Sequence, residues 1–285
     1  MFIYSVMVGF VFMREYESAS SINTFRQCPR KYYYHYILGL PIKNTIYTLR
    51  GNIIHLVLQD FFGVELEDIT DYEGKFREIV INLFNYHWID NLQELKDLGL
   101  ENGEIKDFYN QSLMMLDNFA RNFSKKILKE LENGLSLKQA FEKIKPQTEM
   151  YYISEDYKIQ GYIDAIHNIS GDIILIDYKT SKKTEITREY ELQLALYALM
   201  YQEKHGVLPT KVGINFLISG EEYLIDVNNE LLLKAKMACE EIHTCTLSYN
   251  IKDYSRNITK LCDWGSGKCE FYNRCFNQKV LVNFK

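Results

Sequence analysis

The chain has 285 residues, of which 47% are hydrophobic, and it contains only 4 prolines. This composition excludes a disordered protein and supports a sizeable core, either in one domain with an insertion or in two domains. The formal charge of −5 does not exclude a phosphate ligand, because the charge is unevenly distributed. Residues 61–142 hold 9 basic and 16 acidic residues, whereas the rest of the chain holds 24 and 22 and is slightly basic.

Residues 1–13, MFIYSVMVGFVFM, are apolar but too short for a membrane span. They also lack the basic start and the small-residue cleavage site of a signal peptide. The sequence therefore predicts a first strand here, or a translation start at Met7 or Met13. We expect an intracellular, cytoplasmic protein that does not bind a membrane.

Residues 18–38 predict two short helices. Several serines are typical of a helix start, and the Cys28-Pro29 pair interrupts the periodic pattern, so a turn is expected there. Basic residues alternate with aromatic residues along this segment. That pattern suits base stacking with phosphate contacts, and it equally suits a packed aromatic helix surface.

Residues 49–62 predict a helix with an apolar face that carries His55. A single histidine on such a helix is either a core residue or a ligand, and its spacing alone favours the core. The following residues, 63–148, read as a helical insertion that shapes or covers a site. Its expected amphipathic helices are 74–88, 104–132 and 136–144.

Residues 161–179, GYIDAIHNISGDIILIDYK, predict two strands joined by a tight turn at Ser170-Gly171-Asp172. Because side chains alternate along a strand, Asp177 and Lys179 project to the same face. Asp164 lies on the partner strand, so the hairpin can bring three charged groups together. The bland alternative is an exposed hairpin with solvated charges.

The apolar run at residues 173–176 weakens that alternative, because it is typical of a strand covered on both faces. A carboxylate at the end of such a strand is costly unless it is paired or binds a cation. Two aspartates beside a lysine therefore suit a divalent metal ion with a fixed positive charge next to it.

A helix is expected at residues 189–204, where Gln193 and Tyr197 lie four residues apart and share a face. The remaining expected elements are strands 149–154, 157–168, 172–179, 211–218 and 222–227 and a helix over 229–249. The element order predicts an α/β fold with a central mixed sheet flanked by helices.

The chain has six cysteines, three of them in a Gly-containing C-terminal loop: Cys262, Cys269 and Cys275. In an intracellular protein this grouping favours metal binding over disulfides, with Cys28 as the fourth ligand. Four thiolates suit either zinc or an iron–sulfur cluster. Cys239 and Cys245 are expected to be buried free thiols.

A set of ordered motifs resembles the RecB-like nucleases of the PD-(D/E)xK superfamily, in the iron–sulfur branch. That branch includes the nuclease domain of AddB and the CRISPR-associated adaptation exonucleases. The resemblance covers residues 20–62, 149–200 and the C-terminal tail. Its motifs are Cys-Pro-Arg-Lys-Tyr from Cys28, RGNIIH from Arg50, GYID from Gly161, DYKT from Asp177, QLALY from Gln193, and the three late cysteines.

This resemblance implies a restriction-endonuclease-like core and a role for each matching residue. His55, Asp164, Asp177 and the Tyr178 carbonyl would bind Mg²⁺ or Mn²⁺, and Glu149 matches a further acidic position. Lys179 would orient the attacking water or stabilise the developing charge. Catalysis would also involve the two metal-binding aspartates and the Gln/Tyr motif, Gln193 and Tyr197.

The resemblance also favours a 4Fe-4S cluster on Cys28, Cys262, Cys269 and Cys275, clamping the two ends of the chain together. The domains would be 1–62 with the histidine and the first cysteine, 63–148 as the insertion, 149–228 as the nuclease core, and 229–285 as the tail. One departure is the six residues between Cys262 and Cys269, where the family commonly has a C-x-x-C pair. The gap casts doubt on Cys262 in particular.

The implied function is a metal-dependent DNA exonuclease that prefers single-stranded ends, with partners in repair or replication. The insertion is longer than in compact CRISPR-associated enzymes, which favours a stand-alone enzyme of a phage, virus or repair system, in the host cytoplasm if viral. One alternative is a CRISPR-adaptation nuclease that trims precursor spacers beside an integrase. The other is a catalytically silent DNA-binding iron–sulfur protein.

Overall fold

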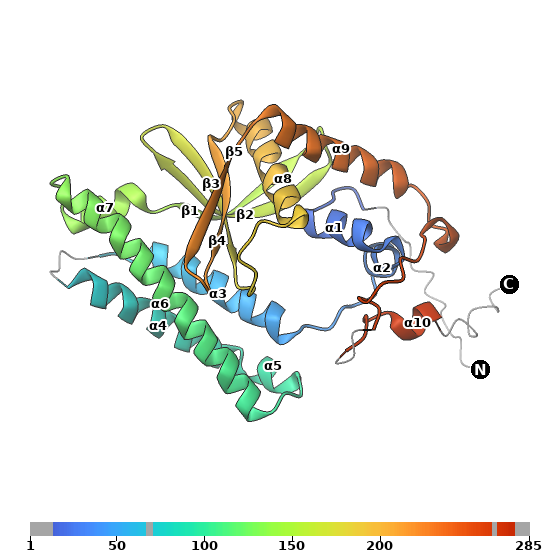
Figure 1. Ribbon diagram of the computed structural model, residues 1–285, viewed down its shortest axis with the longest axis horizontal. Helices are drawn as coiled ribbons and strands as arrows, with labels where there is room; N and C mark the ends of the chain where they lie inside the picture. The colour runs from blue at the N-terminus through green and yellow to red at the C-terminus, as the bar shows by residue number, and fades with distance from the viewer. Residues whose placement is uncertain (1–13, 67–70, 264–266, 277–285) are drawn as a thin grey trace, which may run out of the picture. The chain divides into compact units, whose positions relative to one another are not determined.

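The computed structural model describes residues 14–66, 71–263 and 267–276. The first strand, or later start, predicted for residues 1–13 lies outside these ranges. The chain forms two compact units (Figure 1). One unit comprises residues 44–154 and 160–235, and the other comprises residues 1–43, 155–159 and 236–285.

The larger unit contains a five-stranded mixed sheet in the order β1-β2-β3-β4-β5. Strands β2 and β3 are antiparallel, β3 and β4 are parallel, and β4 and β5 are antiparallel, which confirms the predicted mixed sheet. The strands are β1 (Gln147–Ser154), β2 (Ile159–Ile169), β3 (Asp172–Lys179), β4 (Lys211–Phe216) and β5 (Glu221–Asp226).

The predicted hairpin turn joins β2 to β3. Ser170 and Gly171 both have positive φ, 55° and 94°, as a two-residue hairpin turn with the twist of its strands requires. This turn sets a register in which Ala165 pairs with Ile176. Continued by one pair, the same register sets Asp164 opposite Asp177, near the far ends of both strands.

Helices cover both faces of the sheet. Helix α8 (Arg188–His205) contacts β1, β3 and β4, and Leu194, Ala195 and Ala198 along it are fully buried. On the other face, apolar residues of α3 (Ile46–Gly63) and α6 (Asn102–Glu132) share one hydrophobic core with Ala165, Ile176 and Tyr178 of the sheet. Strand β3 is thus apolar on both faces, as its sequence predicts.

The insertion is helical, as expected. Its helices are α4 (Tyr72–Asp90), α5 (Leu92–Asp97), α6 and α7 (Leu137–Ile144); the short α5 was not predicted. Phe61 at the end of α3 packs edge-to-face with Phe76, Phe119 and Phe141, one from each longer helix. Aromatic burial of this kind fixes the insertion to the helix that carries His55.

The smaller unit begins with the predicted pair of short helices, α1 (Ala19–Gln27) and α2 (Pro29–Tyr32), separated at Cys28. A π-helical turn, Tyr33–Ile37, continues α2. Helix α9 (Asn229–Cys245) ends four residues before the predicted Tyr249. A 3₁₀ turn (Ile251–Asp253) and a short helix, α10 (Tyr272–Phe276), follow in the tail.

Candidate active site

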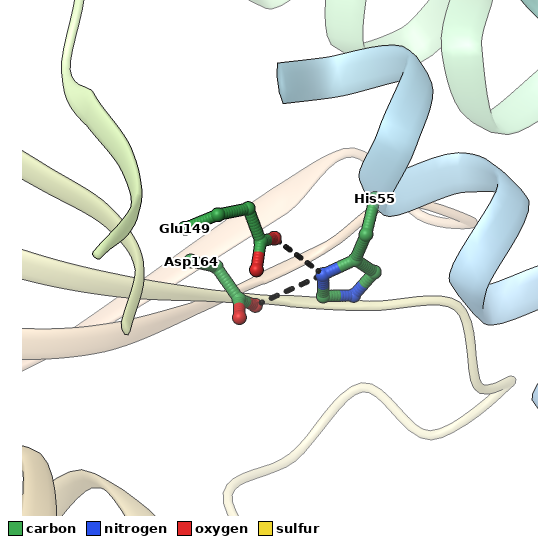
Figure 2. Close-up of side chains that lie close together, drawn as sticks. All are labelled: His55, Glu149 and Asp164. Carbon is green, nitrogen blue, oxygen red and sulfur yellow. Dashed lines mark hydrogen bonds and ion pairs between the residues drawn. The ribbon is translucent and has the colours of Figure 1, made fainter. Parts of the chain in front are cut away.

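Three potential ligands meet where α3 passes the ends of β1 and β2. Figure 2 shows His55 from α3 facing Glu149 and Asp164 on the two neighbouring strands. The His55 Nδ1 lies 3.2 Å from a Glu149 oxygen and 3.6 Å from Asp164 Oδ2. One ligand atom from each of the three residues lies within 4.8 Å of the others, close enough for a shared metal ion.

The backbone of Tyr178 holds two of these side chains in place. Its N–H donates a 2.7 Å hydrogen bond to Asp164 Oδ2, and its carbonyl oxygen lies 3.1 Å from His55 Nε2. The Tyr178 side chain is buried on the opposite side of β3, where its ring packs edge-to-face on Phe119 of α6. A buried aromatic anchor thus fixes a peptide that points both of its polar groups into the site.

A second group forms around Asp177, beside the first. Lys179 Nζ lies 2.7 Å from Asp177 Oδ2 and donates a 2.8 Å hydrogen bond to Gln193 Oε1. Gln193 Nε2 donates to the Tyr197 hydroxyl at 2.7 Å, and that hydroxyl donates to Asp177 Oδ1 at 3.3 Å. The four side chains close a ring, so the structure brings together all four residues that the strand and helix spacings predicted on common faces.

Burial and charge shift the pKa of both acids and bases here. Burial, together with Asp177, raises the pKa of Asp164 to about 7. Burial lowers the pKa of His55, but its hydrogen bond to Glu149 and the nearby aspartates outweigh burial and raise this pKa to about 9. The pKa of Lys179 is likewise raised, because the Asp177 carboxylate outweighs burial. The site therefore holds excess negative charge that it neutralises only in part.

The donor set suits a hard divalent cation. It offers carboxylate oxygens, a peptide carbonyl and one imidazole, which are ligands that Mg²⁺ and Mn²⁺ accept. The buried Asp177 Oδ2 accepts no hydrogen bond, although the Lys179 ammonium is close. Two buried aspartates side by side, with an unsatisfied oxygen, are the environment in which a cation is favourable.

Glu149 contributes more directly than the sequence suggested. It stands inside the His55 group, and its backbone has φ 50°, a left-handed conformation that is costly for a residue with a Cβ. Such strain tends to occur at functional sites, where surrounding contacts enforce it. The strand pattern of residues 149–154 carries no sign of this conformation.

Sequence reasoning missed Arg50, five residues before His55 on α3. Its side chain is buried, and it donates hydrogen bonds to the Thr180 carbonyl at 2.9 Å and to Gln111 at 3.2 Å. It therefore secures the chain just after Lys179. The available signal was a charged residue within the apolar stripe of α3, formed by Leu49, Ile53 and Ile54.

In the smaller unit, the four predicted cluster cysteines line a single pocket. Cys28 comes from the start of α2, and Cys262, Cys269 and Cys275 come from the tail. All are free thiols and are partly buried. The pocket walls combine aromatic side chains with three cationic ones: Arg30, Lys31 and Arg256.

The long gap between Cys262 and Cys269 does not separate these residues. Asp263 and Lys268 form an antiparallel bridge, and the Cys269 N–H donates to the Cys262 carbonyl at 3.0 Å. The chain therefore returns on itself, which places Cys262 in the pocket despite the doubt raised by its spacing. Of the remaining cysteines, Cys239 is buried as expected, but Cys245 is exposed, so its predicted burial is wrong. Cys245 is the last residue of α9, beyond its buried face.

No helix in the described ranges is long and apolar enough to cross a membrane.

Comparisons with known proteins agree with this architecture. The chain is 30% identical over 123 residues to the CRISPR-associated exonuclease Cas4 of Francisella tularensis subsp. novicida, covering 43% of this chain and 58% of that protein. Over 142 residues, or 49% of its length, it is 27% identical to an ATP-dependent helicase/nuclease polypeptide of Streptococcus pyogenes serotype M3, of which it covers 10%. The chain thus spans little more than half of one curated relative and a tenth of the other.

A solved structure of an exonuclease candidate from Eubacterium rectale shares the fold. It matches with a TM-score of 0.51 at 14% identity, over 95% of this chain and 91% of the other. The profile described as the PD-(D/E)XK nuclease superfamily matches residues 17–275, nearly the whole chain. On this match, and on the strands and ligands just described, the chain belongs to the PD-(D/E)XK nuclease superfamily and is a nuclease of the RecB-like kind.

Proposed function

We propose that this nuclease is a Mg²⁺- or Mn²⁺-dependent deoxyribonuclease that hydrolyses DNA from an end and prefers single strands. The observation that carries the proposal is the pairing of two groups at adjacent strand ends. One group, His55, Glu149 and Asp164, offers metal ligands, and the other presents the Lys179 ammonium on Asp177.

The metal ion would be held by His55, Glu149, Asp164 and Asp177, with the Tyr178 carbonyl as a further ligand. A bound Mg²⁺ or Mn²⁺ neutralises a phosphate oxygen and lowers the pKa of a coordinated water. The protein's own task is to keep these groups ready. Tyr178 N–H orients the Asp164 carboxylate, and a carboxylate that is already hydrogen-bonded loses less freedom when it binds a cation.

Lys179 supplies fixed positive charge beside the reacting phosphate. Its ammonium is held by Asp177 and by Gln193, and the Gln193 amide is itself oriented by Tyr197. Burial raises the pKa of the Tyr197 hydroxyl well above its ordinary value, so this group stays protonated and remains a donor. A preorganised cation of this kind stabilises negative charge as it develops in the transition state.

The loop after β3 supports a polyanionic substrate. Lys182 and Lys183 are exposed there, a few residues beyond Lys179. Basic side chains next to a phosphodiester site add affinity for the DNA backbone without reading its sequence. The helical insertion, packed on the helix that carries His55, provides the cover under which a single strand would thread.

We also propose a 4Fe-4S cluster on Cys28, Cys262, Cys269 and Cys275. Tetrahedral zinc with bonds of about 2.3 Å would set sulfurs about 3.8 Å apart. Within the described ranges, no three of these sulfurs lie within 4.8 Å of one another, a spread that favours a larger inorganic core. Arg30, Lys31 and Arg256 around the pocket offset the negative charge of four thiolates. The cluster would serve to hold the early helices to the tail.

The test is hydrolysis of single-stranded DNA blocked at its 5′ or its 3′ end, and of circular single-stranded DNA, with Mg²⁺, with Mn²⁺ or with chelator. Metal-dependent loss of linear substrate that is prevented by one end block is expected, with circles spared. Cleavage of circles at the same rate would overturn the end-dependent activity. No metal-dependent cleavage of any substrate would leave the chain as a silent DNA-binding protein.

A second candidate function is supported by the similarity to Cas4, a CRISPR-associated exonuclease. In this role the same site would trim precursor spacers in company with an integrase. Co-purification with an integrase, and trimming of an overhang to a defined length only in its presence, would favour this role over a stand-alone exonuclease.

A further inference from the structure

Two exposed tyrosines lie together on neighbouring strands of the larger unit. Tyr151 on β1 and Tyr162 on β2 have ring centroids 5.1 Å apart at an interplanar angle of 50°. Their exposed fractions are 44% and 57%, although each has buried neighbours along its strand. A large aromatic surface left open in this way is not required by the core.

Both rings point away from α8. The neighbouring Tyr152 is buried and packs on Tyr201 of α8, so Tyr151 projects to the opposite face of β1. A Cβ added to Gly161 would lie 3.6 Å from Met200 of α8, so Tyr162 projects away from that helix as well. The two tyrosines thus share the side of the strands that α8 leaves uncovered.

The pair is also close to the candidate metal ligands. Tyr151 follows Glu149 by two residues, and Tyr162 precedes Asp164 by two. At about 3.3 Å per strand residue, each ring is carried about 7 Å along its strand from a site carboxylate. This is roughly twice the 3.4 Å rise between stacked nucleotides, so a base on the rings would lie within about two nucleotides of a phosphodiester at the site.

The rings are held in place before any ligand arrives. The Tyr151 hydroxyl donates a 2.7 Å hydrogen bond to Gln160 Oε1, and each ring restricts the other. Cross-strand aromatic pairs stabilise a sheet by themselves, by roughly 0.2–1 kcal/mol. That role would be met equally well by a buried pair, whereas exposure beside a phosphodiester site suits a ligand with flat faces.

We propose that Tyr151 and Tyr162 form a tyrosine platform on which bases of single-stranded DNA stack beside the phosphodiester to be cleaved. This inference rests on the proposed nuclease function and specifies its substrate. Bases in a duplex are already stacked and paired, so they cannot offer a free face to the rings, whereas unpaired bases can. The tyrosine platform thereby gives a physical reason for single-strand preference without reading sequence.

The first arm of the test measures binding without cleavage. In a Lys179→Ala background, a labelled oligothymidylate is titrated and its anisotropy is followed. Adding Tyr151→Leu and Tyr162→Leu together should weaken binding about 10-fold or more, since stacking on aromatic side chains contributes substantially per base. Tyr151→Phe with Tyr162→Phe keeps both rings and should bind normally. Tyr86→Leu, at a 66% exposed tyrosine on α4, is the matched control and should change nothing.

The second arm removes the base instead of the ring. An oligonucleotide of equal length with abasic residues should bind the Tyr-containing protein about as weakly as the normal oligonucleotide binds the double-leucine variant. That variant should show no further loss on abasic DNA. If it binds both DNAs in the same ratio as the Tyr-containing protein, or if the latter binds no single-stranded DNA, the tyrosine platform is overturned.

The two proposals fail in different ways. If the wild-type protein cleaves no DNA with metal, the nuclease function fails, while the binding arms still decide the platform. If it cleaves single strands and the double-leucine variant cleaves them with unchanged kcat/KM, the platform alone fails. Folding of the leucine variant is monitored by its melting temperature, and the abasic arm on the Tyr-containing protein requires no ring substitution at all.

Discussion

The candidate metal site and the cysteine pocket differ in the atoms they present and in the backbone that carries them. The metal site offers oxygen and imidazole on regular elements, and its side chains hydrogen-bond to one another or to the Tyr178 peptide. The cysteine pocket offers sulfur on a short helix and an irregular tail. Its thiols make few contacts; the Cys262 sulfur lies 3.7 Å from the Asn257 carbonyl.

This difference indicates different dependence on the bound group. Hard oxygen ligands bind a divalent cation that exchanges with solvent, and the ring around Asp177 keeps the site assembled before the cation arrives. Thiolates bind soft metals tightly, and four sulfurs on loosely structured chain gain order only from what they hold. We therefore expect the first site to be needed for chemistry and the second for stability, and the following changes test that separation.

The largest effect is expected for Asp164→Asn. The new side chain still accepts the hydrogen bond from Tyr178 N–H but carries no charge for the cation, so cleavage should fall by about 1000-fold or more. Single-turnover cleavage and Mn²⁺ titration measure the loss. Iron content and the cluster absorbance should be unchanged, and a loss of iron here would mean that the two sites are not separate.

Cys28→Ser should have the opposite signature. Losing one of four thiolates should abolish the cluster absorbance and cost about 2 kcal/mol or more of stability, which lowers the melting temperature by roughly 4–8 °C. Mn²⁺ affinity should stay within a factor of about 2, because the metal ligands lie in the other unit. Calorimetry with parallel iron analysis measures both, and a cluster that survives the substitution would contradict the assignment of Cys28.

The pH dependence of metal binding should be intermediate in size. His55 has its pKa raised to about 9, so below that pH a proton must leave before the ring can bind the cation. Mg²⁺ affinity should rise up to about 10-fold per pH unit between pH 7 and 9. In the metal-free protein the sign reverses, since the stability contributed by protonated His55 is present below pH 6.5 and is lost as pH rises to about 9. Titration calorimetry in buffers of different ionisation enthalpy would show proton release, and its absence would exclude His55 as a ligand.

The smallest effect is expected for Cys245→Ser. This exposed thiol at the end of α9 does not line the cysteine pocket, so iron content, melting temperature and cleavage should all be unchanged. The substitution is the matched control for Cys28→Ser. A comparable loss of iron would show that the pocket has been assigned to the wrong cysteines.

Local patterns in the sequence determined much of the fold and part of the site. Period-two alternation set Asp177 and Lys179 on one face, and four-residue helical spacing did the same for Gln193 and Tyr197, because these periods follow from backbone geometry alone. The Ser170-Gly171 turn fixed the hairpin for the same reason. The motifs added the identity of His55 and of the cysteines through resemblance, which spacing could not supply.

Only the tertiary structure decided which distant groups meet. His55 and Glu149 are 94 residues apart, and their contact depends on how α3 packs on the sheet. The left-handed backbone of Glu149 and the buried guanidinium of Arg50 are likewise enforced by surrounding contacts. Cys262 reaches its pocket because the Asp263–Lys268 bridge folds the chain back. Sequence specifies local geometry, whereas long-range contacts arise from the packing of whole elements, and the site is built from both.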